Sequence, residues 1–205
     1  VGLYKAGIEL ETLDGYGNVS KIRQTLQRLR REQRFPYVVI DFESDGLRQL
    51  RRYANDGLLP AEFKHWETDF EEENFSTGEL VRVANALARQ SGAKVRVTVR
   101  EVHDRRQANL AKGTDKRIVG LISECFGPEF NFKEQKGAQW GTALADWALD
   151  HHPPPTHRDE HGQRPIIGVL QFLLRASYAD YLGTVQGMMP TETGELTKRP
   201  PAPSQ

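Results

Sequence analysis

Apolar positions in the first ninety residues follow two spacings, one typical of strands and one typical of helices. Strands are predicted where apolar residues alternate with charged ones or gather in short β-branched runs, over residues 6–13, 36–41 and 62–66. Helices are predicted where apolar residues recur every three or four positions, over residues 19–29, 47–53 and 76–90. Strand and helix alternate along this half, which predicts an α/β fold with a parallel sheet flanked by helices.

The pattern changes after Gly92 to that of a mostly helical subdomain. Residues 94–102 alternate like a strand, but Thr98 and Glu101 have the spacing of a capping box and favour a helix from Thr98. Further helices are predicted over residues 115–126, 137–150 and 165–181. The chain is therefore divided into an α/β domain, a helical subdomain and a polar, proline-rich disordered tail, over residues 1–92, 93–187 and 188–205.

Acidic side chains follow the second and third predicted strands directly. Asp41, Glu43 and Asp45 come after the second strand, and a cluster from Glu67 to Glu73 comes after the third. The carboxyl ends of parallel strands meet at one edge of a sheet, where ligands bind. Crowded carboxylates repel one another unless a cation lies among them, and magnesium prefers such oxygen ligands. A metal site is therefore predicted, the alternative being a solvated loop that happens to be acidic.

Composition limits the partners of the chain. Its 205 residues carry 28 basic and 28 acidic side chains, a net charge of zero, so a broadly basic nucleic-acid binder is excluded. DNA would be contacted through a local patch such as residues 21–34, for which a solvated helix face is the favoured alternative. No apolar run reaches the length of a membrane helix, so no membrane partner is expected.

Cysteine and histidine usage narrows the chemistry further. The single cysteine, Cys125, excludes an internal disulfide and a cysteine-based zinc site, is expected in the core, and fits a cytoplasmic protein. Four histidines fall in the proline-rich loop over residues 150–163, but their spacing matches no metal-binding pattern, so a surface loop is expected. The motifs of P-loop ATPases, of serine hydrolases and of zinc metalloproteases are absent from the sequence.

The order of several short motifs resembles a Toprim domain, and most closely that of the overcoming-lysogenization-defect (OLD) family nucleases. A strand and a glycine turn come first, in residues 7–10 and 15–18, and the strand ending in Asp41 and Glu43 follows. A later acidic segment and a lysine-glycine segment that opens a helix complete the order, in residues 66–76 and 136–141. The likeness covers residues 7–150 and implies a Toprim-like parallel sheet flanked by helices.

This resemblance implies a DNA endonuclease that depends on magnesium or manganese. Asp41 matches the first acid of the family's D-x-D motif, and Glu43 stands at the second. The metal ligands so implied are Asp41, Glu43, Asp69 and Glu71, with Asp45 as a substitute. Lys136 matches the lysine that supports the transition state, so the implied catalytic residues are Asp41, Glu43 and Lys136.

The chain departs from the family pattern at its start. Toprim domains begin with a strand that carries a glutamate, and residues 6–13 here match the family's second strand. The glutamate strand is expected before Val1, unless Glu9 or Glu11 takes its role in a shortened topology. OLD-family proteins also carry an ATPase, which we expect in the same longer chain or in a partner chain, and a homo-oligomer is a further expectation. The alternative function is a Toprim-like module that binds nucleic acid or a partner without cutting.

Overall fold

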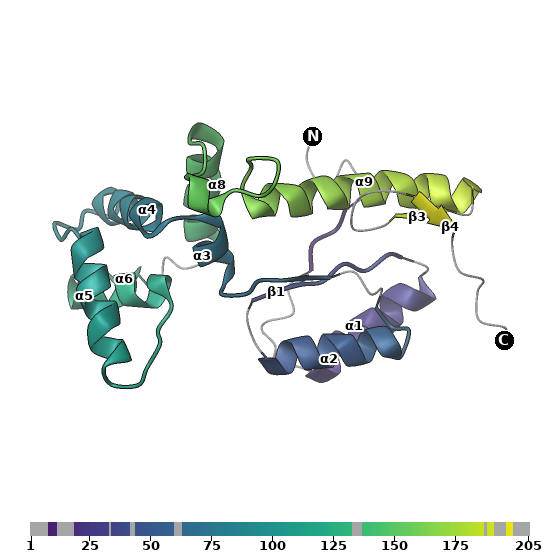
Figure 1. Ribbon diagram of the computed structural model, residues 1–205, viewed down its shortest axis with the longest axis horizontal. Helices are drawn as coiled ribbons and strands as arrows, with labels where there is room; N and C mark the ends of the chain where they lie inside the picture. The colour runs from purple at the N-terminus through teal and green to yellow at the C-terminus, as the bar shows by residue number, and fades with distance from the viewer. Residues whose placement is uncertain are drawn as a thin grey trace. The chain divides into compact units, whose positions relative to one another are not determined.

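The computed structural model describes residues 8–11, 19–32, 34–41, 44–59, 63–132, 137–186, 188–190 and 196–198 (Figure 1). The chain divides into two compact units. Unit 1 comprises Val1–Glu67 and Ile166–Gln205, and unit 2 comprises Thr68–Pro165. No helix in the described part of the chain is long and apolar enough to cross a membrane.

Unit 1 is built around a small parallel sheet with helices packed on it. Strand β1 (Val39–Ile40) pairs in parallel with β2 (Lys64–His65), and α2 (Ser44–Asn55) makes the crossover between them. The helices α1 (Val19–Arg31) and α2 lie on the same side of the strands (Figure 1). Their apolar stripes meet strand β1 in one core, formed by Ile22, Leu26, Val38, Leu50, Tyr53 and Leu59. The α/β arrangement predicted for this half is confirmed at this coarse level.

The first predicted strand is wrong over the residues that the structure describes. Residues 8–11 take no regular structure, and the rest of the predicted strand, like the glycine turn, lies outside the described residues. Leu10, whose side of the predicted strand is opposite to that of Glu9 and Glu11, is 76% exposed. The alternating acids have another role, because Glu9 pairs with Arg34 and Glu11 pairs with Arg28, each at 2.7 Å. Charge pairing with the basic end of α1 therefore accounts for the alternation.

Unit 2 is a helical bundle with a core of its own. Its elements are α3 (Phe70–Asn74), α4 (Thr77–Gln90), α5 (Val99–Leu110), α6 (Ile118–Phe126), the 3₁₀ turn η2 (Gly127–Glu129), α8 (Ala138–Asp150) and the 3₁₀ turn η3 (Pro155–His157). Capping boxes are present at Ser76 and Glu79, where the helix over residues 76–90 was predicted to begin, and at Thr98 and Glu101, as predicted, before α5. The helical character predicted after Gly92 is confirmed.

Helix α4 belongs to unit 2, whereas the sequence grouped it with the strands in residues 1–92. Leu80 and Ala84 of α4 are fully buried and lie in one core cluster with Leu121 and Ile122 of α6. An apolar stripe shows that a helix is buried on one face and leaves open what covers that face. The boundary between the compact units accordingly falls after Glu67.

The C-terminal part of the chain returns to unit 1. Helix α9 (Pro165–Gln186) starts at the predicted proline and continues beyond the predicted end. The ring of Phe172 in α9 lies 5.0 Å from the ring of Tyr37, which precedes β1. Strands β3 (Met188–Pro190) and β4 (Leu196–Lys198) pair antiparallel within the segment that was expected to be disordered.

Candidate functional site

The carboxyl edge of the two-stranded sheet in unit 1 is the candidate site. Ile40 is level with His65 in the parallel register, and the Trp66 amide donates to the Ile40 carbonyl at 3.0 Å. Asp41 therefore follows β1 at the edge where Trp66 and then Glu67 follow β2. Within unit 1, Asp41 and Glu67 thus follow paired strands at one edge, and the prediction that the two acidic clusters face one crevice stays a prediction.

The described side chains at this edge combine exposed acids with one buried aromatic ring. Asp41 and Glu67 are exposed, whereas Trp66 is 1% exposed and anchors the end of β2. The ammonium of Lys64 lies 4.2 Å from the centre of the Trp66 ring, within range of a cation–π contact. Exposed carboxylates beside a rigid strand end suit a hydrated divalent ion, which keeps several of its waters.

Three of the predicted site residues cannot be placed by side chain. Glu43 and Lys136 lie outside the described residues, and Asp45 lies in the first turn of α2 with its side chain outside the described part. Among the residues that the structure does describe, no three acidic, histidine or cysteine side chains converge as a metal site would require. The prediction that Asp41, Glu43 and Asp45 share a metal stays a prediction.

Asp69, the second residue of unit 2, caps the N-terminus of α3. Its Oδ1 atom accepts a hydrogen bond from the Glu72 amide at 2.7 Å, and the Asp69 side chain is 8% exposed. A carboxylate at this position satisfies an amide that has no partner inside the helix and faces the positive end of the helix dipole. The residue predicted as a metal ligand therefore has a structural role in unit 2.

The three glutamates after Asp69 also have partners within unit 2. Glu71 accepts a hydrogen bond from the Trp140 indole of α8 at 3.1 Å, and Glu72 accepts one from the Ile118 amide of α6 at 2.9 Å. Glu73 accepts one from the Thr68 amide at 3.1 Å. These bonds explain why so many acids cluster here without requiring a cation, since each carboxylate is satisfied by a donor. That Asp69 and Glu71 hold a metal stays a prediction.

A buried ion pair at the centre of unit 2 was missed by the sequence reasoning. Arg164 is 2% exposed, and its Nη2 atom lies 2.7 Å from Oε1 of Glu79. Arg164 also donates to the carbonyls of Asn74 at 2.6 Å and His151 at 3.1 Å. Trp147 of α8 donates to the same Glu79 carboxylate at 3.1 Å. This pair joins the start of α4 to the end of α8 and the loop that follows it.

The pKa of Glu79 leads to a prediction about acid stability. Burial on its own raises the pKa of this carboxyl, but hydrogen bonds from Arg164, Ser76 and Trp147 outweigh burial and lower the pKa to about 2. Since the folded-state pKa lies below the ordinary value of 4.5, Glu79 stabilises the fold fully above pH 4.5 and loses that contribution as pH falls toward 2. The loss should reach about 2–3 kcal/mol.

Urea unfolding followed by tryptophan fluorescence between pH 5 and pH 2.5 measures this contribution. The free energy of unfolding of the parent protein should fall more steeply with acid than that of the Glu79→Gln variant. Equal slopes would show that Glu79 titrates alike in the folded and unfolded chains.

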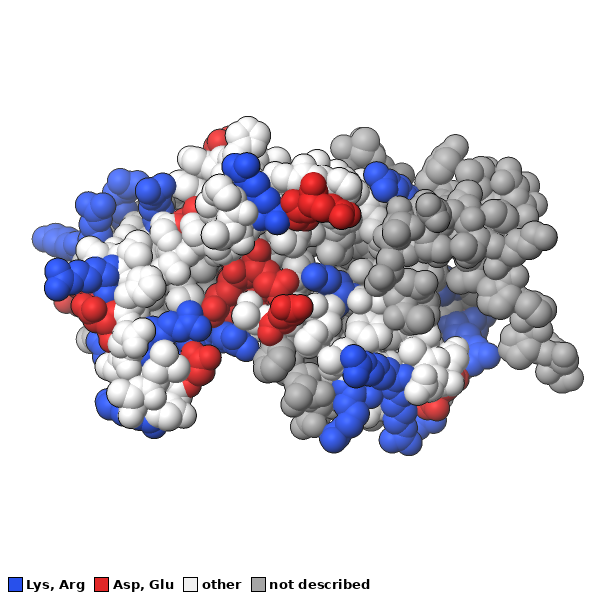
Figure 2. All heavy atoms as spheres, in the orientation of Figure 1, with Lys and Arg blue, Asp and Glu red and all other residues white. Residues whose placement is uncertain are grey.

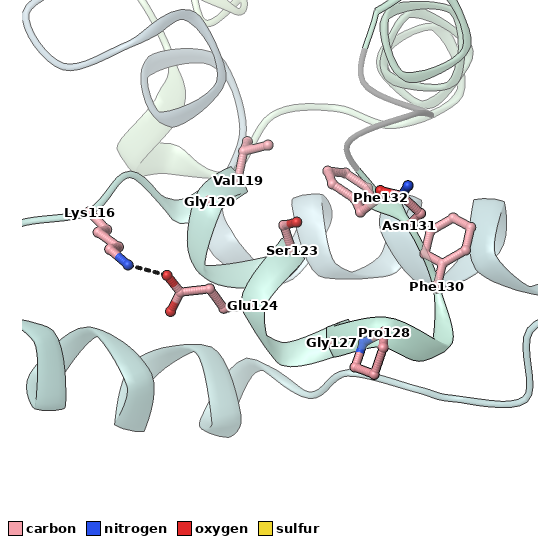
Figure 3. A pocket seen from close by; sticks show the side chains of 10 residues that line it. All are labelled: Lys116, Val119, Gly120, Ser123, Glu124, Gly127, Pro128, Phe130, Asn131 and Phe132. Atoms are coloured by element: carbon pink, nitrogen blue, oxygen red, sulfur yellow. Dashed lines mark hydrogen bonds and ion pairs between the residues drawn. The ribbon is translucent and has the colours of Figure 1, made fainter.

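A pocket of about 720 Å³ lies in unit 2 between α6 and the segment after it (Figure 3). Phe130 and Phe132 line one side, and Gly120 and Ser123 of α6 line another. Lys116 and Glu124 are the two charged residues that line it in the described part of the chain, and they pair with each other, so this described wall presents no unpaired charge to a phosphate. We place no phosphodiester chemistry in this pocket.

The loop histidines and the cysteine match the structural roles expected for them. His151 stacks on Trp147 with ring centres 3.6 Å apart, His157 contacts Thr156, and His161 lies 3.6 Å from Glu160. Each of these histidines thus has a separate neighbour. Cys125 packs against the core of unit 2, and burial raises the pKa of its thiol, which disfavours a reactive thiolate.

Comparison with known proteins identifies no relative: no family model, no curated protein and no solved structure matches the chain.

Proposed function

We propose that this chain is a metal-dependent DNA endonuclease domain with its metal site at the carboxyl edge of β1 and β2. The observation that carries the proposal is the parallel pairing of these strands, because it puts exposed Asp41 at the edge where Glu67 follows β2. Ligands of open α/β sheets bind at this edge. The order of motifs, which resembles that of OLD-family Toprim domains, supports nucleolytic chemistry.

The donor set at this edge fits a hard divalent cation. Asp41 and Glu43 would hold magnesium or manganese, since carboxylate oxygens are the ligands that these ions prefer, and Asp45 is the next acid along the chain. In the resemblance, Asp69 and Glu71 complete the ligand set. When bound, such an ion supplies Lewis acidity for water-dependent cleavage of a phosphodiester. In the resemblance, Lys136 also matches the lysine whose ammonium meets the charge that develops on the phosphate.

A second candidate function is a Toprim-like module that binds nucleic acid or a partner without cutting. The observation that favours it is that acids of the second cluster are already hydrogen-bonded within unit 2. Asp69 caps α3, and Glu71 accepts a hydrogen bond from the Trp140 indole. Both residues of the later acidic pair therefore stabilise the fold of unit 2. A carboxylate held in this way is less available as a ligand.

Metal-dependent cleavage by the unmodified chain decides between the two functions. Supercoiled plasmid would be incubated with the protein and magnesium, then manganese, with a chelator as control. We expect nicked and linear plasmid to appear with a metal and to be absent with the chelator. Calorimetric titration with manganese would be run beside it. Metal binding without cleavage would favour the binding module. The absence of both metal binding and cleavage would contradict the metal site.

A further inference from the structure

We propose that the outward faces of α1 and α2 form the surface through which this chain binds the backbone of double-stranded DNA. The two helices carry eight cations and a single acid, Asp45, although the chain as a whole has no net charge. Basic side chains gather over these helices (Figure 2). The cations are Lys21, Arg23, Arg28, Arg30 and Arg31 of α1 and Arg48, Arg51 and Arg52 of α2.

Packing turns the charged faces of both helices outward. Ile22 and Leu26 of α1 and Leu50 and Tyr53 of α2 are buried in the core of unit 1. Positions 48, 51 and 52 lie on the opposite side of α2 at helical spacing, and all three arginines are exposed. At the C-terminal ends of the two helices, a guanidinium nitrogen of Arg30 lies 3.8 Å from where a side chain on Gly57 would begin, so Arg30 of α1 reaches the turn that follows α2.

Part of this charge is neutralised within the fold and part is not. Arg28 pairs with Glu11 and Glu32, and Arg34, just after α1, pairs with Glu9. By contrast, Arg23, Arg51 and Arg52 have no carboxylate within ion-pair distance among the described residues. An exposed cluster of uncompensated cations attracts a polyanion, and the attraction grows with the number of phosphates it neutralises.

The composition of the surface favours a duplex backbone over other polyanions. Seven of the eight cations are arginines, whose guanidinium groups donate paired hydrogen bonds that match phosphate. The two helices contain one aromatic residue, Tyr53, and it is 2% exposed, so no ring is presented for the base stacking that single strands need. The apolar faces of both helices are packed inside unit 1, which leaves them unable to insert into a membrane surface.

The choice of DNA as the partner rests on the proposed function. The charged surface itself does not depend on the metal site. Binding through phosphate contacts requires no divalent ion. It can therefore be measured in the presence of a chelator, where no cleavage occurs. A failure of the surface and a failure of the nuclease would then be seen in separate experiments.

The test is fluorescence anisotropy of a labelled DNA duplex with the full chain in a chelator, over a series of salt concentrations. The variant Arg23→Gln/Arg51→Gln/Arg52→Gln should weaken binding about 10- to 100-fold and lower the slope of log affinity against log salt by about 2.7, or about 0.9 for each lost phosphate contact. The variant Arg23→Lys/Arg51→Lys/Arg52→Lys keeps the charge and should retain most of the affinity and the slope.

A matched control removes the same charge from unit 2. The variant Lys94→Gln/Arg96→Gln/Lys112→Gln replaces three exposed cations there and should leave affinity within about 2-fold. Equal weakening by this control, or no weakening by the arginine variant, would overturn the proposal. Tighter binding of a single strand, or of anionic vesicles, than of the duplex would also overturn it. Circular dichroism of each variant reports that the fold is retained.

Discussion

Arg164→Met is expected to lower the free energy of unfolding of unit 2 by about 3–5 kcal/mol, because it leaves a buried charge without its partner. Glu79 has a side-chain exposure of 9%, and Arg164 is the first of the hydrogen-bond donors that lower the pKa of its carboxyl in the parent protein. The carbonyls of Asn74 and His151 would also lose the donor that satisfies them. A buried acceptor left without a partner costs far more than an exposed one, since no water replaces the lost bond.

Packing adds to the effect of this substitution. The guanidinium of Arg164 lies 4.6 Å from the centre of the Phe75 ring, within range of a cation–π contact. Methionine fills part of the same volume, so the expected loss comes mainly from charge and hydrogen bonding. Chemical denaturation followed by tryptophan fluorescence reports on unit 2, because two of the three tryptophans, Trp140 and Trp147, lie in α8.

Two further variants distinguish the contribution of the ion pair to the free energy of unfolding from the general effect of replacing an arginine. Arg89→Met removes an exposed arginine near the end of α4 and should change the free energy of unfolding by about 0.5 kcal/mol or less. The double variant Glu79→Gln/Arg164→Met should cost less than the sum of its single changes, because it leaves no buried charge. An Arg164→Met protein as stable as its parent would contradict the role assigned to this pair.

Asp41→Ala is expected to abolish metal-dependent plasmid cleavage, with a loss of more than about 100-fold. Substitution of a residue that only supports a metal ligand costs up to about 100-fold, so the loss of a ligand should exceed that value. The expected cause is loss of a carboxylate at the end of β1, where the proposed ion would be held. The side chain of Asp41 is exposed, so its removal should leave the fold intact. Cleavage rates with magnesium and with manganese measure the loss of activity, and circular dichroism measures whether the fold is retained.

Asp56→Ala provides the matched control for this change. Asp56 is an exposed acid of the same unit, and it follows the C-terminal end of α2. Because α2 runs back from the carboxyl edge of the sheet, Asp56 lies at the far end of this helix from Asp41. Its removal should leave cleavage unchanged. Cleavage that survives Asp41→Ala would overturn the metal site, and equal loss in both variants would indicate a general loss of structure.

Predictions from the sequence succeeded where the controlling interactions are local. The helix starts at Ser76 and Thr98 follow from capping bonds to the residue three positions on, which a short motif specifies completely. The strand that ends before Asp41 was also identified, although its paired part is two residues long. The prediction failed at residues 8–11, where the alternation of Glu9 and Glu11 arises from pairing with arginines of the α1 region.

The sequence by itself determined the long helical segments, though not the short helix α3, which faces of the long helices are apolar, and that an acid directly follows a parallel strand. The tertiary structure decided which unit each helix joins and what the acids of the second cluster contact. The physical reason is the distance along the chain between partners. Glu71 meets Trp140 across 69 residues, and Glu79 meets Arg164 across 85. Nothing in the local pattern around a glutamate distinguishes a carboxylate that will bind a metal from one that will accept such a distant donor.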